Sequence, residues 1–389
     1  MISNILPVAA LAGAAMAACP LSVEITGATG HVASVAVTNT ADEAITVFKG
    51  NTVLLDHSTK DLMVADASGK PLAFEGSYVK YRRVGIAPEM FQTIQPGETV
   101  TKLVNAATTY RLAGVESADI SALQGFHYVT GSTAPTSLKE TEFCETTSNT
   151  MNITPDQSKV AAEHLSARAE PVFNSRVQKR SVKFSSCSSS QTSTLTTAVS
   201  DAISMSTKAS TAAGSSLYYF TTWFKSTSVI SKVQGIYNSV AGVQSTSPTI
   251  SCTDTYRGCT DGSALLYTVP SANVVVCTKT SHPLPSPILL ALQDLANPKI
   301  LNLDILTDTY KVPCPSNGFY GFPELADNCA DDDYDKGGSI LHEFTHLYGT
   351  DDYAYGQTAA KKLSAAQAAA NADTYEIYAG SVRLGGCSS

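Results

Sequence analysis

The segment from Ser339 to Gly356 holds the residues best suited to metal chemistry. His342 and His346 are four positions apart in a stretch that predicts a helix, and such residues share one helix face. Their imidazole nitrogens can therefore bind one metal ion at about 2.0–2.1 Å. Glu343 directly follows the first histidine, so its carboxylate reaches a water molecule rather than the metal. The H-E-x-x-H pattern predicts the zinc helix of a metallopeptidase.

The surroundings of this pattern favour a real site over a chance match. Five-residue patterns do arise by chance, and most histidine pairs on helices are ordinary core or surface residues. Here the pattern contains two of the three histidines that follow residue 180. It is also flanked by apolar residues that would bury it, namely Ile340, Leu341, Phe344 and Leu347.

A candidate third ligand lies a few residues beyond the end of the predicted zinc helix. A catalytic zinc takes three protein ligands and keeps a fourth position open. Gly349 can adopt the left-handed conformation that ends a helix and turns the chain back. Asp352, six residues after His346, then returns to the metal, whereas we expect Asp351 to point elsewhere. A turn-capping or solvated carboxylate is the alternative for Asp352.

The spacing H-E-x-x-H-x-x-G-x-x-D invites comparison with metzincins, which need a methionine turn downstream of the zinc helix. None of the six methionines follows residue 346, and this excludes that family. The sequence instead resembles the deuterolysin family of secreted fungal zinc endopeptidases, also called aspzincins. The resemblance rests on H-E-x-x-H with G-T-x-D-x-x-Y-G, which runs here from Gly349 to Gly356, and on residues 371–375. The link from His346 to Gly349 is shorter than in many members.

The resemblance implies a role for each matching residue. His342, His346 and Asp352 match the ligands of one zinc ion per catalytic domain, and Glu343 matches the general base. The zinc ion would lower the pKa of its bound water toward about 7, so that Glu343 can take the proton during attack on a peptide carbonyl. Tyr355 matches the family tyrosine that leans toward the substrate oxyanion.

Two further residues are less strongly marked. Asp373 either orients a ligand histidine or displaces Asp352 as the third ligand, and we favour the first. Tyr320, upstream of the zinc helix, is a further catalytic candidate, with an ordinary buried tyrosine as the alternative.

Charge bears on the substrate. The net charge is −8, and an acidic cluster precedes the zinc helix at Asp331, Asp332, Asp333 and Asp335. An acidic rim would attract basic polypeptides, in line with the family's preference for basic proteins. A solvated or cation-binding loop explains the cluster equally well.

The rest of the chain predicts the domains that surround this site and how the protein is processed. Residues 1–17 read as a signal peptide ending in an A-x-A site, and no other run is apolar enough to span a membrane. Residues 18–180 read as a propeptide, with a β-sandwich over about 19–131 and a linker and helix over about 135–180. That helix is expected to begin at Thr154, and Lys179-Arg180 is the expected processing site. Residues 181–389 read as a mainly α catalytic domain of the zincin type, with a small antiparallel sheet.

Nine cysteines fit an exported protein, and none forms a C-x-x-C pair. Their distribution suggests that each half is stapled separately. The candidates in the second half are Cys187, Cys252, Cys259, Cys277, Cys329 and Cys387, with Cys314 left as the odd thiol. The pairing stays open.

The resulting hypothesis is a secreted zinc endopeptidase made as a zymogen, with protein substrates and a processing protease as partners. We expect no nucleic-acid partner, no membrane partner and a monomer. The alternative is a secreted β-sandwich binding or adhesion protein with a structural zinc. A structural zinc normally has four protein ligands, whereas this sequence offers three and a glutamate beside the first histidine.

Overall fold

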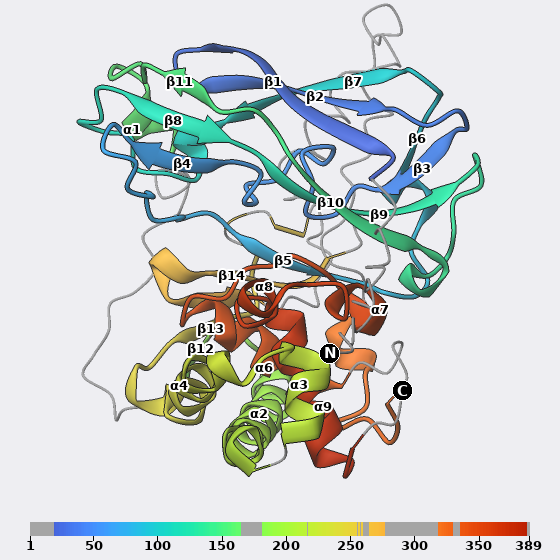
Figure 1. Ribbon diagram of the computed structural model, residues 1–389. Coiled ribbons are helices and arrows are strands. Elements are labelled where there is room, and N and C mark those ends of the chain that lie inside the picture. The colour runs from blue at the N-terminus through green and yellow to red at the C-terminus, as the bar shows by residue number, and fades with distance from the viewer. Residues whose placement is uncertain are drawn as a thin grey trace, which may run out of the picture.

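The computed structural model describes residues 19–164, 181–215, 217–254, 256, 258–259, 264–276, 318–329 and 335–386. A β-rich part formed by residues before 165 lies against a helical part formed by residues after 180 (Figure 1). The expected signal peptide, Lys179-Arg180 and Asp331 to Asp333 lie outside the described residues.

The β-rich part consists of three antiparallel sheets around one core. The first contains β1 (Leu21–Thr29), β2 (Val32–Asn39) and β7 (Thr99–Asn105). The second contains β10 (Glu142–Thr147), β9 (Leu123–Thr130), β3 (Ile45–Phe48) and β6 (Phe91–Ile94). The third contains β11 (Met151–Ile153), β8 (Ala118–Ser121) and β4 (Met63–Asp66). Alternate residues of β1 face the core, as strands with one solvent face require.

The segment predicted as linker and helix differs from expectation. It carries β10 and β11, which pair with β9 and β8, so the β-rich region continues to Ile153. The helix there, α1, spans only Val160–Glu163 and does not begin at Thr154. Asp156 Oδ1 accepts hydrogen bonds from the backbone N–H and hydroxyl of Ser158. This local turn competes with helix formation and delays its start.

The helical part packs its helices around the zinc motif. Its helices are α2 (Ser189–Ser215), α3 (Leu217–Phe224), α4 (Ile230–Ala241), α6 (Lys336–His346), α7 (Gly356–Ala360), α8 (Ala365–Ala368) and α9 (Ala372–Arg383). The zinc motif lies on α6, as predicted. α2 packs against α4, α6 and α9, and their apolar faces form one core. The described residues also form short 3-10 helices, namely η1 (Pro88–Met90), η2 (Ala106–Thr108), η3 (Leu138–Glu140), η5 (Thr227–Val229), η6 (Val243–Ser245), η7 (Pro270–Ala272) and η9 (Phe319–Gly321).

One mixed sheet joins the two parts. Its order is β12 (Lys183–Ser185), β13 (Thr249–Ser251), β15 (Val274–Val276), β14 (Ala264–Val269) and β5 (Tyr78–Tyr81). The prediction of an antiparallel sheet was wrong for β12–β13 and β13–β15, which are parallel. The helices between β12 and β13 form the long crossover that parallel pairing needs. The outer strand β5 comes from the β-rich part and lies on the boundary between the parts (Figure 1).

The two described disulfide pairs each lie within one part of the chain. Cys19 pairs with Cys144 and Cys187 pairs with Cys252. Cys259 and Cys329 are also disulfide-bonded, while Cys277, Cys314 and Cys387 lie outside the described residues. The expectation of separately stapled halves is confirmed for the two described pairs.

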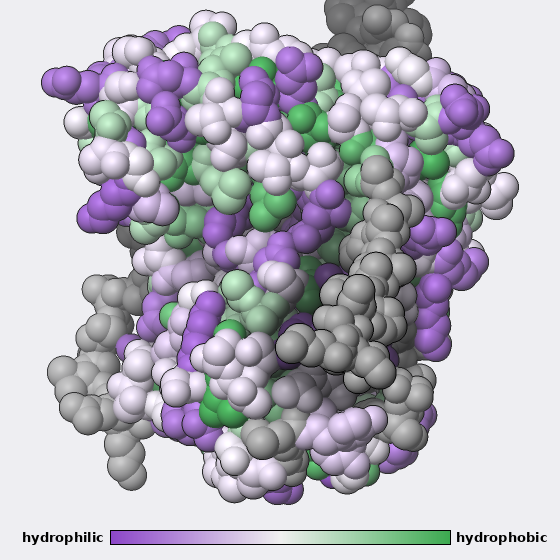
Figure 2. All heavy atoms as spheres, viewed as in Figure 1, coloured by the Kyte–Doolittle hydropathy of each residue, from purple (hydrophilic) through white to green (hydrophobic). Residues whose placement is uncertain are grey.

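The described surface is mixed in character. On the face shown in Figure 2, hydrophobic residues are scattered among hydrophilic ones. The large hydrophobic side chains that are exposed sit on separate elements, with Leu103 on β7 and Tyr218 on α3. Among the described helices, none combines the length and the apolar character that crossing a membrane requires.

Candidate metal centre

Helix α6 presents the zinc motif from a fully buried position. Asp335 caps the helix, since its carboxylate accepts hydrogen bonds from Gly338 N–H and, at 2.9 Å, from Ala326 N–H. The helix ends at His346, and Gly349 then takes the left-handed φ of 94° that was expected. Asp335 is only 5% exposed, so it is a cap and does not belong to an acidic rim.

The short loop after α6 brings Asp352 back to both histidines. Asp352 Oδ1 lies 3.2 Å from His342 Nε2, and Asp352 Oδ2 lies 3.5 Å from His346 Nε2. One ligand atom from each residue lies within 4.8 Å of the others. Asp351 points elsewhere, toward Lys60 and Tyr78.

The chemistry of these three side chains fits a cation. In the described part of the chain, His342 Nε2, His346 Nε2 and both carboxylate oxygens of Asp352 are buried without a hydrogen-bond partner. Buried polar atoms normally have partners, so this cluster is suited to metal ligation. Burial alone would raise the pKa of Asp352, but His346 and His342 lower it below its usual value. Two imidazoles and one carboxylate also match the ligand types of catalytic zinc.

Glu343 lies beside this cluster and is held by β14. Thr268 Oγ1 donates a 2.6 Å hydrogen bond to Glu343 Oε2. Burial raises the pKa of Glu343 to about 7, which suits a group that exchanges protons at neutral pH.

Tyr355 presents a hydroxyl donor next to the same histidine. Its ring stacks near His342, with centroids 6.3 Å apart. Burial, together with the Asp352 carboxylate, raises the pKa of Tyr355 well above its usual value, so the hydroxyl stays protonated. It donates a 2.7 Å hydrogen bond to the carbonyl oxygen of Val79.

Asp373 and Glu376 lie on α9, on the opposite side of the His342 ring. His342 Nδ1 is 3.5 Å from Asp373 Oδ1 and 3.4 Å from Glu376 Oε2. These three residues form a second group with metal-ligand spacing. However, Lys80 and Arg83 from the β-rich part already form ion pairs with both carboxylates. Both carboxylates are placed to orient His342, since ligand histidines commonly pair their second nitrogen with a carboxylate.

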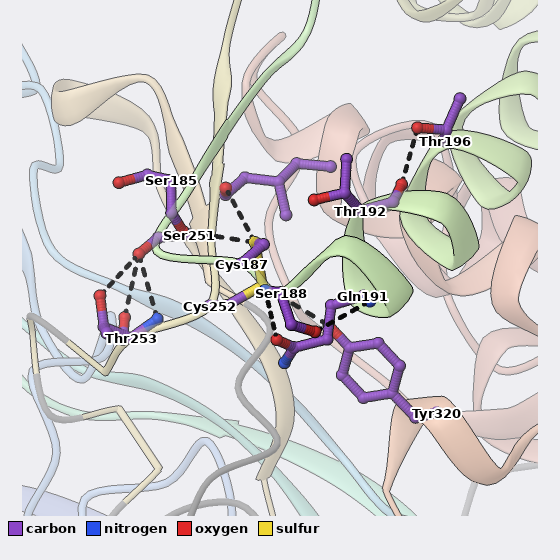
Figure 3. The surroundings of a disulfide bond; sticks show 11 residues. Ser185, Cys187, Ser188, Gln191, Thr192, Thr196, Ser251, Cys252, Thr253 and Tyr320 are labelled. Atoms are coloured by element: carbon purple, nitrogen blue, oxygen red, sulfur yellow. Dashed lines mark hydrogen bonds between the residues drawn. A yellow bond between two sulfur atoms is a disulfide. The ribbon is translucent and has the colours of Figure 1, made fainter.

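Tyr320 lies in a different environment. Its hydroxyl is 3.6 Å from Cys252 Sγ, beside the Cys187–Cys252 disulfide (Figure 3). Tyr320 also belongs to the partly buried residues that pack against the helical core. This surrounding matches the alternative of an ordinary buried tyrosine.

The site also contains residues that the sequence did not reveal. Glu376 lies one turn after Asp373 on α9, and this spacing, which places two carboxylates on one helix face, could have indicated it. Thr268 carried no signal, because its role depends on how β14 packs against α6. Lys80 and Arg83 precede the zinc motif by more than 250 positions, and no local pattern links them to it.

Comparisons with known proteins point to a metalloprotease family. A family model described as deuterolysin metalloprotease (M35) family matches residues 1–285, and one described as lysine-specific metallo-endopeptidase matches residues 306–380. A neutral protease 2 homolog of Phaeosphaeria nodorum is 31% identical over 98% of this chain and 99% of its own length. Another, from Sclerotinia sclerotiorum, is 28% identical over 93% of this chain and 90% of its own length.

Proposed function

The chain belongs to the deuterolysin metalloprotease (M35) family and is a zinc metalloendopeptidase, and from this premise we propose which residues do the work. His342, His346 and Asp352 hold the zinc ion, and Glu343 is the general base. The observation that carries this assignment is the convergence of buried ligand atoms that lack hydrogen-bond partners, contributed by α6 and the loop after it. The family also removes the alternative of a binding protein with a structural zinc.

The residues divide the chemistry between them. A bound zinc ion supplies Lewis acidity at a carbonyl oxygen and lowers the pKa of water. Glu343 takes a proton from the attacking water and later delivers it to the leaving amine. Tyr355 donates a hydrogen bond to the oxygen on which negative charge develops. Asp373 orients the ring of His342 through its Nδ1 atom.

The test of these roles is the substitution Glu343→Gln. Because the glutamine cannot accept the proton, peptidase activity should fall by about 100- to 10,000-fold, while metal analysis should still find one zinc per chain. Glu324→Gln is the control, since Glu324 is partly exposed and pairs with Lys336 away from the site. A zinc-loaded Glu343→Gln enzyme with full activity would overturn the assignment.

We also propose a preference for basic substrates that arises within the site itself. Asp373 and Glu376 are buried carboxylates whose partners here are the cations of Lys80 and Arg83. We propose that they accept a basic side chain of the substrate, and the family model matched at residues 306–380 is described as lysine-specific. Peptides that carry lysine or norleucine at one position should differ in kcat/KM, and the difference should persist in high salt because the contact is buried. Equal rates would refute the preference.

We further propose an exported precursor, with a signal peptide over residues 1–17, a propeptide over 18–180 and a catalytic domain over 181–389. The support is the apolar first segment and the dibasic pair at Lys179-Arg180. N-terminal sequencing of active secreted material should start at Ser181. The variant Lys179→Gln/Arg180→Gln should accumulate uncut chain. Active material that retains residues 19–180 would refute the propeptide.

A further inference from the structure

We propose that β5, residues Tyr78–Tyr81, is a substrate-like inhibitory strand of the metal centre. It places the Val79–Lys80 peptide bond where the bond of a substrate would be cleaved, and it thereby keeps the unprocessed chain latent. This inference rests on the proposed function and concerns the regulation of the same site. Backbone, carbonyl and side-chain contacts carry it separately.

The backbone of β5 occupies the sheet edge that faces the site. It pairs antiparallel with β14, with Thr268 opposite Tyr78 and Leu266 opposite Lys80. Thr268 is the residue that holds Glu343. Among the described strands, β14 would be the edge of this sheet without β5, and extended peptides bind such edges by adding a strand. The β-rich part therefore supplies the strand that a substrate would otherwise supply.

The carbonyl of Val79 meets the hydroxyl proposed to stabilise the substrate oxyanion. Tyr355 donates to Val79 O at 2.7 Å, and Asn51 Nδ2 donates to the same oxygen at 3.0 Å. Asn51 also donates to the Tyr355 hydroxyl oxygen. The carbonyl is therefore clamped between two donors, one of which belongs to the β-rich part.

The next side chain, Lys80, enters the acidic pair beyond His342. It is fully buried and forms ion pairs with Glu376 and, at 3.8 Å, with Asp373. Arg83 adds a second cation, with its Nη2 atom 3.3 Å from each carboxylate. A buried cation is tolerated only when opposite charges compensate it, so the pair and Lys80 depend on each other.

The preceding side chain, Tyr78, lies over the zinc motif. Its ring is parallel to that of His346, with an interplanar angle of 2° and a centroid distance of 4.4 Å. Its hydroxyl donates to Asp351 at 2.7 Å. The cavity that remains beside Asp352 measures about 60 Å³, whereas sites for small ligands are usually about 300–1,000 Å³. Strand β5 thus fills the space that a substrate needs.

The experiment uses the full chain locked by Lys179→Gln/Arg180→Gln, loaded with zinc and assayed on a lysine-containing peptide. Removing the buried cation with Lys80→Ala should raise the kcat/KM of the locked chain by about tenfold or more. Lys80→Arg should stay latent because it keeps the charge. Lys70→Ala, at an exposed position of the β-rich part, is the matched control and should change nothing.

A second measurement covers the case in which Lys80→Ala unfolds the β-rich part. A synthetic peptide with the sequence of residues 74–84 should inhibit the naturally processed enzyme competitively, and its Lys80→Ala version should bind about tenfold more weakly or worse. Equal inhibition by both peptides, or a folded Lys80→Ala chain as latent as its parent, would overturn the inference. If processed enzyme from the unaltered chain is itself inactive on all peptides, the proposed function fails instead.

Discussion

The hydroxyl of Thr268 acts on the pKa of Glu343 through a hydrogen bond, beside burial and the larger effect of the nearby His342. Its hydrogen bond to the carboxylate lowers the pKa of Glu343, against the larger effect of burial, which raises it. A general base must be deprotonated, so losing this bond should move the acidic limb of the kcat/KM profile to higher pH. A hydrogen bond to a charged group is worth about 1.5–3 kcal/mol, which corresponds to a shift of about one pH unit or more.

The matched pair Thr268→Val and Thr268→Ser tests this effect. Valine keeps the shape without the donor, and serine keeps the donor. We expect the shifted limb only in Thr268→Val, with zinc content unchanged in both. Identical pH profiles for the two variants would show that Thr268 does not act on Glu343.

Asp352 and Asp373 should respond differently to amide substitution. Asp352 faces the Nε2 atoms of both histidines, whereas Asp373 reaches only Nδ1 of His342. Asp352→Asn should therefore lose zinc on dialysis. Asp373→Asn should keep one zinc per chain with about 10- to 100-fold weaker affinity. Metal analysis after dialysis against graded concentrations of chelator checks both variants. Zinc loss in Asp373→Asn alone would mean that Asp373 is the third ligand and Asp352 is not.

At the scale of elements, α6 can approach α2 closely because Gly337 lacks a side chain. A Cβ atom at Gly337 would lie 2.8 Å from Asp201 Cβ and 3.1 Å from Leu325 Cδ2. Gly337→Ala should therefore destabilise the protein by about 1–3 kcal/mol through overpacking. Gly235→Ala on α4 meets nothing within 4 Å, so it should gain about 0.5–1 kcal/mol from helix propensity.

Thermal unfolding of both glycine variants in a Glu343→Gln background avoids self-digestion. Both variants add one methyl group to a helix, so both should gain the same helix propensity. A loss of stability in Gly337→Ala beside a gain in Gly235→Ala would therefore measure the cost of the packing contact. A stabilised Gly337→Ala protein would mean that α2 and α6 can separate at no cost.

Local patterns predicted the elements that depend on local physics. The H-E-x-x-H pattern located helix α6, and Gly349 correctly marked the turn after it. Thr154 failed as a helix start because Asp156 bonds Ser158 and forms a turn instead. The parallel pairings of β12 and β15 with β13 were missed because each depends on how the connecting segment folds: the helices between β12 and β13, and β14 between β13 and β15.

At the scale of the whole molecule, the contacts between the two parts were the least predictable. The match of Asp352 to the family motif could be read from spacing alone. The contacts of Lys80 with Asp373 and Glu376 could not, because they depend on how two parts of the chain that lie far apart in the sequence meet. Sequence patterns therefore indicated the chemistry of the site, while its coverage by β5 required the three-dimensional structure.

The β-rich part contains a buried acid that should make the stability of the protein depend on pH. Burial raises the pKa of Asp61 to about 7, although a hydrogen bond from Thr59 opposes the rise. The pKa of Asp61 in the folded protein thus lies above its ordinary value of 3.8. The contribution of Asp61 is fully present below about pH 4 and is lost as pH rises toward 7, because only the unfolded chain then releases the proton. The loss is at most about 4 kcal/mol, from roughly three pKa units at 1.36 kcal/mol each.

Asp61→Asn keeps the shape of the side chain and removes the titration. In Asp61→Asn, the free energy of unfolding should fall less between pH 4 and 7, and the protein should be more stable at pH 7 than the unaltered chain. Denaturant unfolding in the Glu343→Gln background measures both effects. Asp42→Asn, at an exposed position of the same part, should leave the slope unchanged. Because β5 belongs to this part, its placement over the metal centre in the unaltered protein should also be more stable at pH 5 than at pH 7. A slope that survives Asp61→Asn would assign the pH dependence to other groups.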